Sequence, residues 1–219
     1  MQHVLSLHGA IGEAKATSLD SWAMYVPSLG PRIPSRGNAL TRAIGRTMMT
    51  IMGWSFEGTL PDEPKFVMII APHTSNWDFI VGLWAYFSLS FRASWLGKHT
   101  IFKWPAGPFM RWLGGVPVER SISRDRVREA VHAFESSDKL ILILAPEGTR
   151  KYVPEWKTGF YHVANNAKVP IVPVAFDFGN RVIRLSSPFW TTGNAEGDID
   201  ALQDLYRGIK GKHPENFAL

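Results

Sequence analysis

The sequence predicts a single α/β domain in which a mostly parallel or mixed central sheet is flanked by helices. Three observations predict this class. Apolar runs of strand length alternate with stretches of helical periodicity. The run at 139–144 is almost wholly apolar, which is typical of a central strand buried on both faces. The 219 residues suffice for one domain with a substantial core.

The alternation can be followed along the chain. Short apolar runs predict strands at 54–58, 65–71, 92–96, 115–119, 139–144, 169–176 and 181–185. Apolar residues at helical spacing predict helices at 38–53, 79–91, 124–136, 158–167 and 198–209. Pro170 and Pro173 favour an edge or irregular position for the strand that contains them. The aromatic, basic and proline-broken segment 101–113 is open to three interpretations: the wall of an apolar tunnel, a membrane contact, or a packed irregular connection.

The chain divides into three regions. Proline and glycine predict an irregular N-terminal arm at 1–37, and the main body follows at 61–219. The region between them, 38–60, contains an amphipathic helix with Asn38 as its expected N-cap, followed by a connection. Two arginines lie away from its apolar stripe, which consists of Leu40, Ile44, Met48 and Ile51. Such a helix can lie on an anionic bilayer, whereas an ordinary surface helix would pack its stripe on the core.

The composition excludes several kinds of site. Because the chain has no cysteine, it cannot form disulfides, a thiolate nucleophile or a cysteine-ligated metal site. The net charge of +5, without a dense basic tract, suits anionic lipid or a phosphorylated substrate better than nucleic acid. No apolar run reaches the roughly 18 residues of a membrane-spanning helix, and the N-terminus lacks a signal-peptide pattern. We therefore expect a peripheral protein on the cytoplasmic face of a membrane.

The segment 71–78 has the features of an active-site turn. It follows the apolar run 65–71, precedes a helical pattern, and contains His73 and Asp78. An imidazole titrates near neutral pH and can act as a general base. A carboxylate five residues further on can fix its tautomer and stabilise the imidazolium. On this segment alone, the alternative that His73 and Asp78 only cap the helix stays open.

A second turn, at 145–150, directly follows the apolar run 139–144. Within it, Gly148 allows a ligand to approach the backbone and Thr149 supplies a hydroxyl. Arg150 supplies a guanidinium, whose donors match two phosphate oxygens at once. If the preceding strands are parallel, both turns lie at the same edge of the sheet, where ligands of α/β proteins bind.

Other chemistry is poorly supported. Ser75 lacks the glycine-flanked elbow of a hydrolase nucleophile. No second histidine stands near His73 at metal-ligand spacing, and the glycine patterns of phosphate-binding and dinucleotide-binding loops are absent. We therefore expect neither a metal nor a cofactor.

Four motifs in order resemble those of the glycerolipid acyltransferase family, which includes the 1-acyl-glycerol-3-phosphate acyltransferases. His73 and Asp78 match its His-x4-Asp signature. Three later stretches are similar to its second, third and fourth motifs: Gly115-Val116-Pro117-Val118-Glu119-Arg120, Pro146-Glu147-Gly148-Thr149-Arg150 and Val169-Pro170-Ile171-Val172-Pro173-Val174. The departures, among them Pro72 where the family often has Asn, leave the His–Asp pair intact and bear on the choice of acceptor.

The resemblance implies that 61–219 is an acyltransferase domain. It would move a fatty acyl group from acyl-CoA or acyl carrier protein to a lysophospholipid, by default 1-acyl-glycerol-3-phosphate, giving phosphatidic acid. His73 would deprotonate the acceptor hydroxyl while Asp78 orients His73, with no acyl-enzyme. The residues expected to bind the acceptor are Arg120, Glu147, Gly148, Thr149, Arg150, Lys98 and Lys157. Another lysolipid acceptor, hydrolysis by water and non-catalytic lipid binding at the membrane stay open as alternatives.

Overall fold

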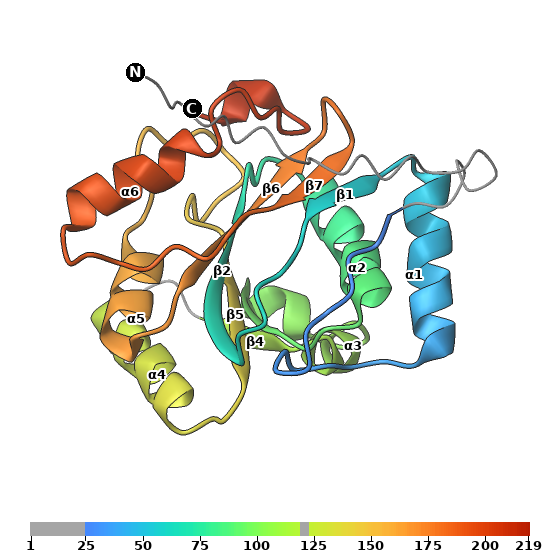
Figure 1. Cartoon of the computed structure of the whole chain (residues 1–219), viewed down its shortest axis with the longest axis horizontal. Helices are drawn as coiled ribbons and strands as arrows, with labels where there is room; N and C mark the ends of the chain where they lie inside the picture. Colours follow the sequence, from blue (N-terminus) through green and yellow to red (C-terminus); the bar gives the residue numbers. More distant parts are fainter. Residues whose placement is uncertain (1–24, 119–122) are drawn as a thin grey trace, which may run out of the picture.

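A seven-stranded sheet with helices on both faces forms the body of the protein, as the sequence predicts (Figure 1). The computed structural model describes residues 25–118 and 123–219. The strands are β1 Ser55–Gly58, β2 Lys65–Ala71, β3 Ser94–Lys98, β4 Gly115–Val118, β5 Leu140–Leu144, β6 Ile171–Asp177 and β7 Val182–Leu185. The helices are α1 Ala39–Ile51, α2 Trp77–Leu89, α3 Gly107–Trp112, α4 Ser123–Glu135, α5 Gly159–Ala167 and α6 Ala195–Asp204, with 3-10 turns η1 His99–Phe102 and η2 Pro214–Asn216.

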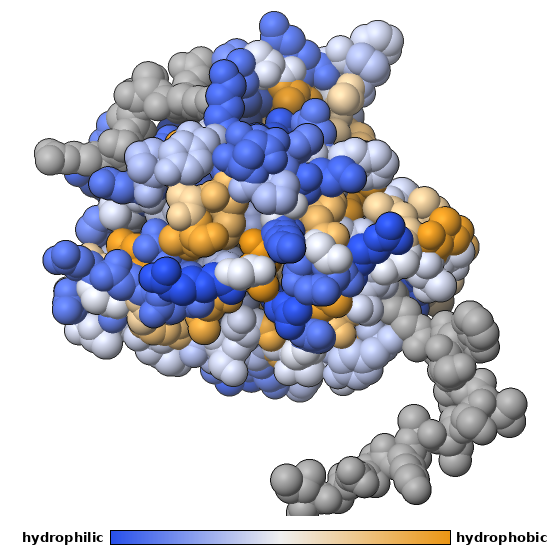
Figure 2. All heavy atoms as spheres, turned by 90° about the horizontal axis from the view of Figure 1, so that it is seen from above, coloured by the Kyte–Doolittle hydropathy of each residue, from blue (hydrophilic) through white to orange (hydrophobic). Residues whose placement is uncertain are grey.

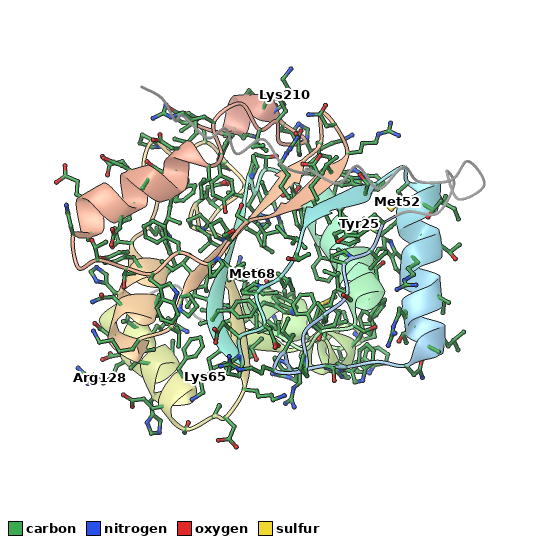
Figure 3. All side chains as sticks on the ribbon, in the orientation of Figure 1. Tyr25, Met52, Lys65, Met68, Arg128 and Lys210 are labelled. Atoms are coloured by element: carbon green, nitrogen blue, oxygen red, sulfur yellow. The ribbon has the colours of Figure 1, made fainter. Side chains whose placement is uncertain are left out.

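The strand order, β1-β7-β6-β2-β5-β3-β4, places the ends of β2 and β5 side by side. Every pair of neighbours is parallel except β6 and β7, which are antiparallel. In Figure 3, Lys65 lies low on β2 and Met68 lies higher, so the carboxyl end of β2 points to the top of that view. The turns that follow β2 and β5 therefore meet at this edge, as expected for neighbouring parallel strands. Figure 2 looks onto this edge from above and shows apolar patches among hydrophilic side chains.

Two apolar clusters, one on each face of the sheet, hold the layers together. Along β2 the side chains alternate between them: Phe66 and Met68 belong to one cluster, and Val67 and Ile69 to the other. The first cluster packs against α1 and α2, and the second against α4, α5 and α6, which lie on opposite sides of the sheet in Figure 1. Burial on both faces explains why β2 is almost wholly apolar.

The prediction of an edge or irregular position for the strand with two prolines is wrong, because β6 lies between β7 and β2. The Ser186 N–H donates to the Pro173 carbonyl oxygen at 3.0 Å, just past the end of β7. The backbone nitrogen and the carbonyl group of one strand residue point to the same neighbouring strand. The nitrogen of Pro173 therefore faces the end of β7, and its lack of an N–H removes no hydrogen bond to β2. Pro170 precedes the strand, and its carbonyl oxygen accepts from the Val67 N–H at 3.0 Å.

The segment 101–113 contains the helix α3, which the sequence analysis did not predict. Pro108 lies in the first turn of α3, where backbone N–H groups have no hydrogen-bond acceptor within the helix, so its missing N–H breaks no hydrogen bond. Phe102 is buried, so part of the segment is a packed connection. Trp104 is 88% exposed and Trp112 is 47% exposed, so outward aromatic surface is also present.

The helix α1 begins at its predicted cap and turns its apolar stripe outward. The Asn38 side chain accepts from the Thr41 N–H at 3.0 Å. The helix packs on α2 through Gly45 and Met49, which are buried. The members of the stripe that are exposed large side chains are Leu40, Ile44 and Ile51, at 67%, 44% and 72% of their surface. Across the described ranges, no helix has the length and apolar character to cross a bilayer.

Candidate active site

His73 and Asp78 form a hydrogen-bonded pair in the turn between β2 and α2. The distance from His73 Nδ1 to Asp78 Oδ2 is 3.1 Å. The Asp78 side chain is only 2% exposed, whereas that of His73 is 25% exposed. A carboxylate that accepts from Nδ1–H fixes the tautomer in which Nε2 carries a lone pair. The imidazole is therefore oriented from inside and can be reached from solvent.

Asp78 also contributes to the start of α2, so capping and orientation of His73 are not exclusive. Its Oδ2 atom accepts from the Ser75 backbone N–H at 2.9 Å, and the Ser75 hydroxyl accepts from the Trp77 N–H at 3.1 Å. A negative charge in the first turn of a helix is favourable. The second carboxylate oxygen, Oδ1, is buried and has no hydrogen-bond partner among the described residues.

Glu147, from the turn after β5, reaches the same turn through the backbone of His73. The His73 N–H donates to both carboxylate oxygens of Glu147, each at 3.0 Å. Glu147 is 2% exposed, and this burial raises its pKa from 4.5 to about 7. The N–H of His73 opposes the rise, and the negative charge of Asp78 adds to it. The carboxyl group therefore changes its charge close to neutral pH.

The rest of the second turn has the conformation that its sequence suggests. Gly148 has a φ of +64°, in the left-handed region that favours glycine. The side chain of Lys157 lies against it, since an added Cβ would come within 3.0 Å of the lysine Nζ. The Thr149 hydroxyl accepts from the Lys151 N–H at 3.3 Å. Arg150 is exposed, and it forms no hydrogen bond or ion pair within the part of the chain that the structure describes.

The structure thus brings together three of the predicted site residues, His73, Asp78 and Glu147. Lys98 ends β3 and is exposed at the same edge of the sheet. Arg120 lies outside the described residues. The acceptor-binding roles of the residues named from the sequence stay predictions.

The C-terminal segment supports the turn in a way that the sequence analysis missed. The His213 N–H donates to the Thr74 hydroxyl at 3.2 Å. The Tyr206 hydroxyl donates to the carbonyl oxygen of Ile69 on β2 at 3.1 Å, across 137 residues of sequence. An added Cβ on Gly211 would lie 2.8 Å from the Thr74 hydroxyl, so any larger residue would require the Thr74 side chain to shift. No sequence signal marks these contacts, because each depends on the packing of distant segments.

A model of the acyltransferase family matches residues 56–177, more than half of the chain. The chain belongs to the acyltransferase family. This segment contains the His73–Asp78 turn and the Glu147–Arg150 turn. The family assignment makes the protein an acyltransferase-type enzyme and confirms the family predicted from the motifs.

Two curated relatives carry the same description. A 1-acyl-sn-glycerol-3-phosphate acyltransferase from Haemophilus influenzae is 25% identical over 176 residues, covering 76% of this chain and 70% of the relative. One from Saccharomyces cerevisiae is 28% identical over 125 residues, covering 46% of this chain and 41% of the relative. A crystal structure of the 1-acyl-sn-glycerophosphate (LPA) acyltransferase PlsC from Thermotoga maritima shares the fold, with a TM-score of 0.57 and 17% identity over 76% of this chain and 75% of that chain.

Proposed function

We propose that the protein transfers a fatty acyl group from a thioester to the free hydroxyl of a lysophospholipid. The acceptor is 1-acyl-glycerol-3-phosphate and the product phosphatidic acid, in keeping with the activity named for both curated relatives. The observation that supports this reaction most directly is the 3.1 Å contact between His73 Nδ1 and Asp78 Oδ2, with His73 partly exposed. It supplies an oriented base at the carboxyl edge of the sheet.

The reaction proceeds by direct transfer. Asp78 accepts from Nδ1–H, and Nε2 of His73 takes the proton of the acceptor hydroxyl as its oxygen attacks the thioester carbonyl. The tetrahedral intermediate collapses and the carbon–sulfur bond breaks. The leaving thiolate takes the proton from Nε2 of His73, which releases a thiol and restores the neutral base. The chain has no cysteine to form an acyl-enzyme. The Ser75 hydroxyl already accepts a hydrogen bond from the backbone of Trp77.

The acceptor phosphate binds on the β5 side of His73. The residues proposed for it are Arg150, Lys157, Lys98 and Arg120, with Gly148 and Thr149 shaping the turn. Arg150 suits this role because it is exposed and its guanidinium can pair with two phosphate oxygens. Glu147 positions the acceptor indirectly, since its carboxylate holds the backbone N–H of His73.

The protein binds the cytoplasmic face of a membrane peripherally, where its lipid acceptor resides. Leu40, Ile44 and Ile51 on α1 supply an outward apolar stripe. Trp104 and Trp112 add exposed indoles elsewhere on the surface, and such side chains favour a membrane interface. No cofactor or metal takes part in this reaction.

The test is transfer by a His73→Ala variant. Purified protein is incubated with labelled acyl-CoA, with and without lysophosphatidic acid, and the products are separated. Loss of the base should lower the transfer rate by about 10²–10⁴ or more. His162→Ala, which removes an exposed histidine from α5, is the matched control and should transfer normally.

The outcomes separate the alternatives. Circular dichroism shows whether the His73→Ala variant is folded, and a folded variant with full activity would falsify the mechanism. Free fatty acid that accumulates whether or not lysophosphatidic acid is present would identify a hydrolase instead. Binding to liposomes with no turnover over a panel of lysolipid acceptors would identify a non-catalytic lipid-binding protein.

A further inference from the structure

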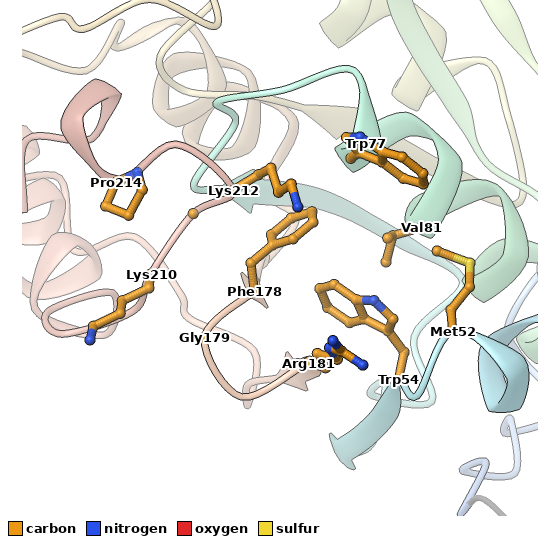
Figure 4. Close-up of a pocket in the computed structure, with 11 residues that line it drawn as sticks. Met52, Trp54, Trp77, Val81, Phe178, Gly179, Arg181, Lys210, Lys212 and Pro214 are labelled. Carbon is orange, nitrogen blue, oxygen red and sulfur yellow. The ribbon is translucent and has the colours of Figure 1, made fainter.

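A cavity of about 460 Å³ lies beside the catalytic turn, on the side opposite the Glu147–Arg150 turn (Figure 4). It is bounded by the start of α2, the turn between β6 and β7, and the segment 210–214. Trp77, one residue before Asp78, lines it. In the sheet, β6 and β7 lie on one side of β2 and β5 lies on the other. The cavity and the proposed acceptor site therefore flank His73 from opposite sides.

The lining of the cavity is cationic. Arg181, Lys210 and Lys212 contribute to it, and no aspartate or glutamate does. None of the three forms an ion pair with an acidic residue in the described ranges. The nearby Asp177 is already engaged by Asn180 and Arg184. Positive charge without a partner at a concave surface suits a ligand with several phosphate groups.

The floor of the cavity is aromatic. Trp77 is 49% exposed, and Nζ of Lys212 lies 6.0 Å from the centre of its indole. Trp54 and Phe178 pack edge to face, with ring centres 4.8 Å apart, and hold the floor rigid. Figure 4 shows the side chain of Lys212 reaching toward Trp77 and that of Arg181 beside Trp54, whereas the side chain of Lys210 points away from the aromatic rings. A nucleobase stacks well on such an exposed indole.

Arg181 ends the turn between β6 and β7, and its carbonyl oxygen accepts from the Ser55 N–H at 3.0 Å. Its φ is +55°, in the left-handed region that glycine and asparagine adopt most easily. Its side chain is exposed and it makes no ion pair with the described acidic residues. The turn thus holds an exposed guanidinium at the mouth of the cavity.

We propose that this cavity binds the nucleotide end of the acyl-CoA donor. The adenine stacks on Trp77, and the phosphates pair with Arg181 and Lys212, while Lys210 lies at the outer rim. The flexible pantetheine arm then extends past Trp77 toward His73. Acyl carrier protein has no nucleotide, so the cavity assigns acyl-CoA as the donor. The inference rests on the proposed transfer for its biological meaning, while the binding itself is independent of turnover.

The test measures binding of adenosine 3′,5′-bisphosphate, which carries the nucleotide's base and two of its phosphates. Isothermal titration calorimetry compares the full chain with an Arg181→Gly variant. Glycine relieves the left-handed conformation, so this variant should fold at least as well as the parent. Loss of one phosphate partner should weaken binding about tenfold or more, and the KM for acyl-CoA should rise without a change in the KM for lysophosphatidic acid.

The matched control is Lys168→Gly. Lys168 is also exposed with a φ of +54°, and it precedes β6 at the opposite edge of the sheet. It should bind the bisphosphate like the parent. A second arm measures binding to vesicles of phosphatidylglycerol in phosphatidylcholine.

Equal bisphosphate affinity in the parent and Arg181→Gly, including the case in which neither binds, would overturn the proposal. If vesicle binding also falls in that variant, the cavity is a lipid-headgroup site instead. Because the bisphosphate assay needs no turnover, it can succeed or fail separately from the proposed acyl transfer.

Discussion

Replacement of Glu147 by glutamine should remove a pH dependence of stability that the fold creates. The carboxyl pKa is 4.5 when unfolded and about 7 when folded, because the side chain is buried. Between these values the folded protein binds more protons than the unfolded chain, so the free energy of unfolding falls as pH rises. The contribution is fully present below pH 4.5 and is lost above pH 7. The difference between the two pKa values corresponds to about 3 kcal/mol in the free energy of unfolding.

Glutamine has nearly the same shape, and its amide oxygen can still accept from the His73 N–H. The free energies of unfolding of the parent and Glu147→Gln are measured by urea denaturation at intervals from pH 4.5 to 8. Their difference cancels every group that titrates alike in both proteins. The parent should lose about 3 kcal/mol relative to the variant across this window, and the difference should then level off.

A matched control is Glu155→Gln, which removes an exposed glutamate from the same loop region. Its stability should run parallel to that of the parent throughout. If the Glu147→Gln curve is also parallel to the parent, burial does not hold the Glu147 carboxyl protonated, and the reasoning fails. An opposite slope, with the parent gaining stability as pH rises, would show that the His73 N–H dominates over burial.

Two further predictions concern α1. Replacing Leu40 and Ile51 together by serine should leave the free energy of unfolding nearly unchanged, because both side chains are exposed. Binding to sedimented anionic vesicles should fall roughly tenfold or more. Unchanged vesicle binding would contradict the membrane role of this face. Gly45→Ala should lower the free energy of unfolding, measured by urea denaturation, by about 1–3 kcal/mol although alanine has the better helix propensity. The reason is that the new Cβ would lie 2.5 Å from the backbone nitrogen of Ser88. A more stable variant would show that α1 and α2 can separate without cost.

Features that depend on local residue patterns could be predicted from the sequence. Features that depend on the pairing of strands far apart in the sequence could not. The His73–Asp78 contact follows from their spacing across a strand end and the first turn of a helix. The interior position of β6 did not follow, because the direction in which Pro173 lacks its N–H depends on the pairing with β7. The role of Glu147 as acceptor for the His73 N–H required β5 to be the neighbour of β2, and no motif gives strand order.

The outward turn of the α1 stripe has a related cause. The periodicity of apolar residues marked one face of the helix, yet the face that packs on α2 is the one with Gly45. A small residue allows two helix backbones to approach, and a hydrophobicity pattern gives it no weight. The larger apolar side chains were thereby left on the outside. Under the proposed function, this unburied stripe would lie against the lipid surface.

The order of strands also explains how one base could serve two phosphorylated substrates. His73 follows β2, which has β5 on one side and β6 on the other. The turn after β5 presents Arg150, and the turn after β6 presents Arg181. Two anions bound on one side would repel each other and compete for the same cations. In the two proposals taken together, the acceptor hydroxyl and the thioester meet at His73 while their phosphates bind on opposite sides of it.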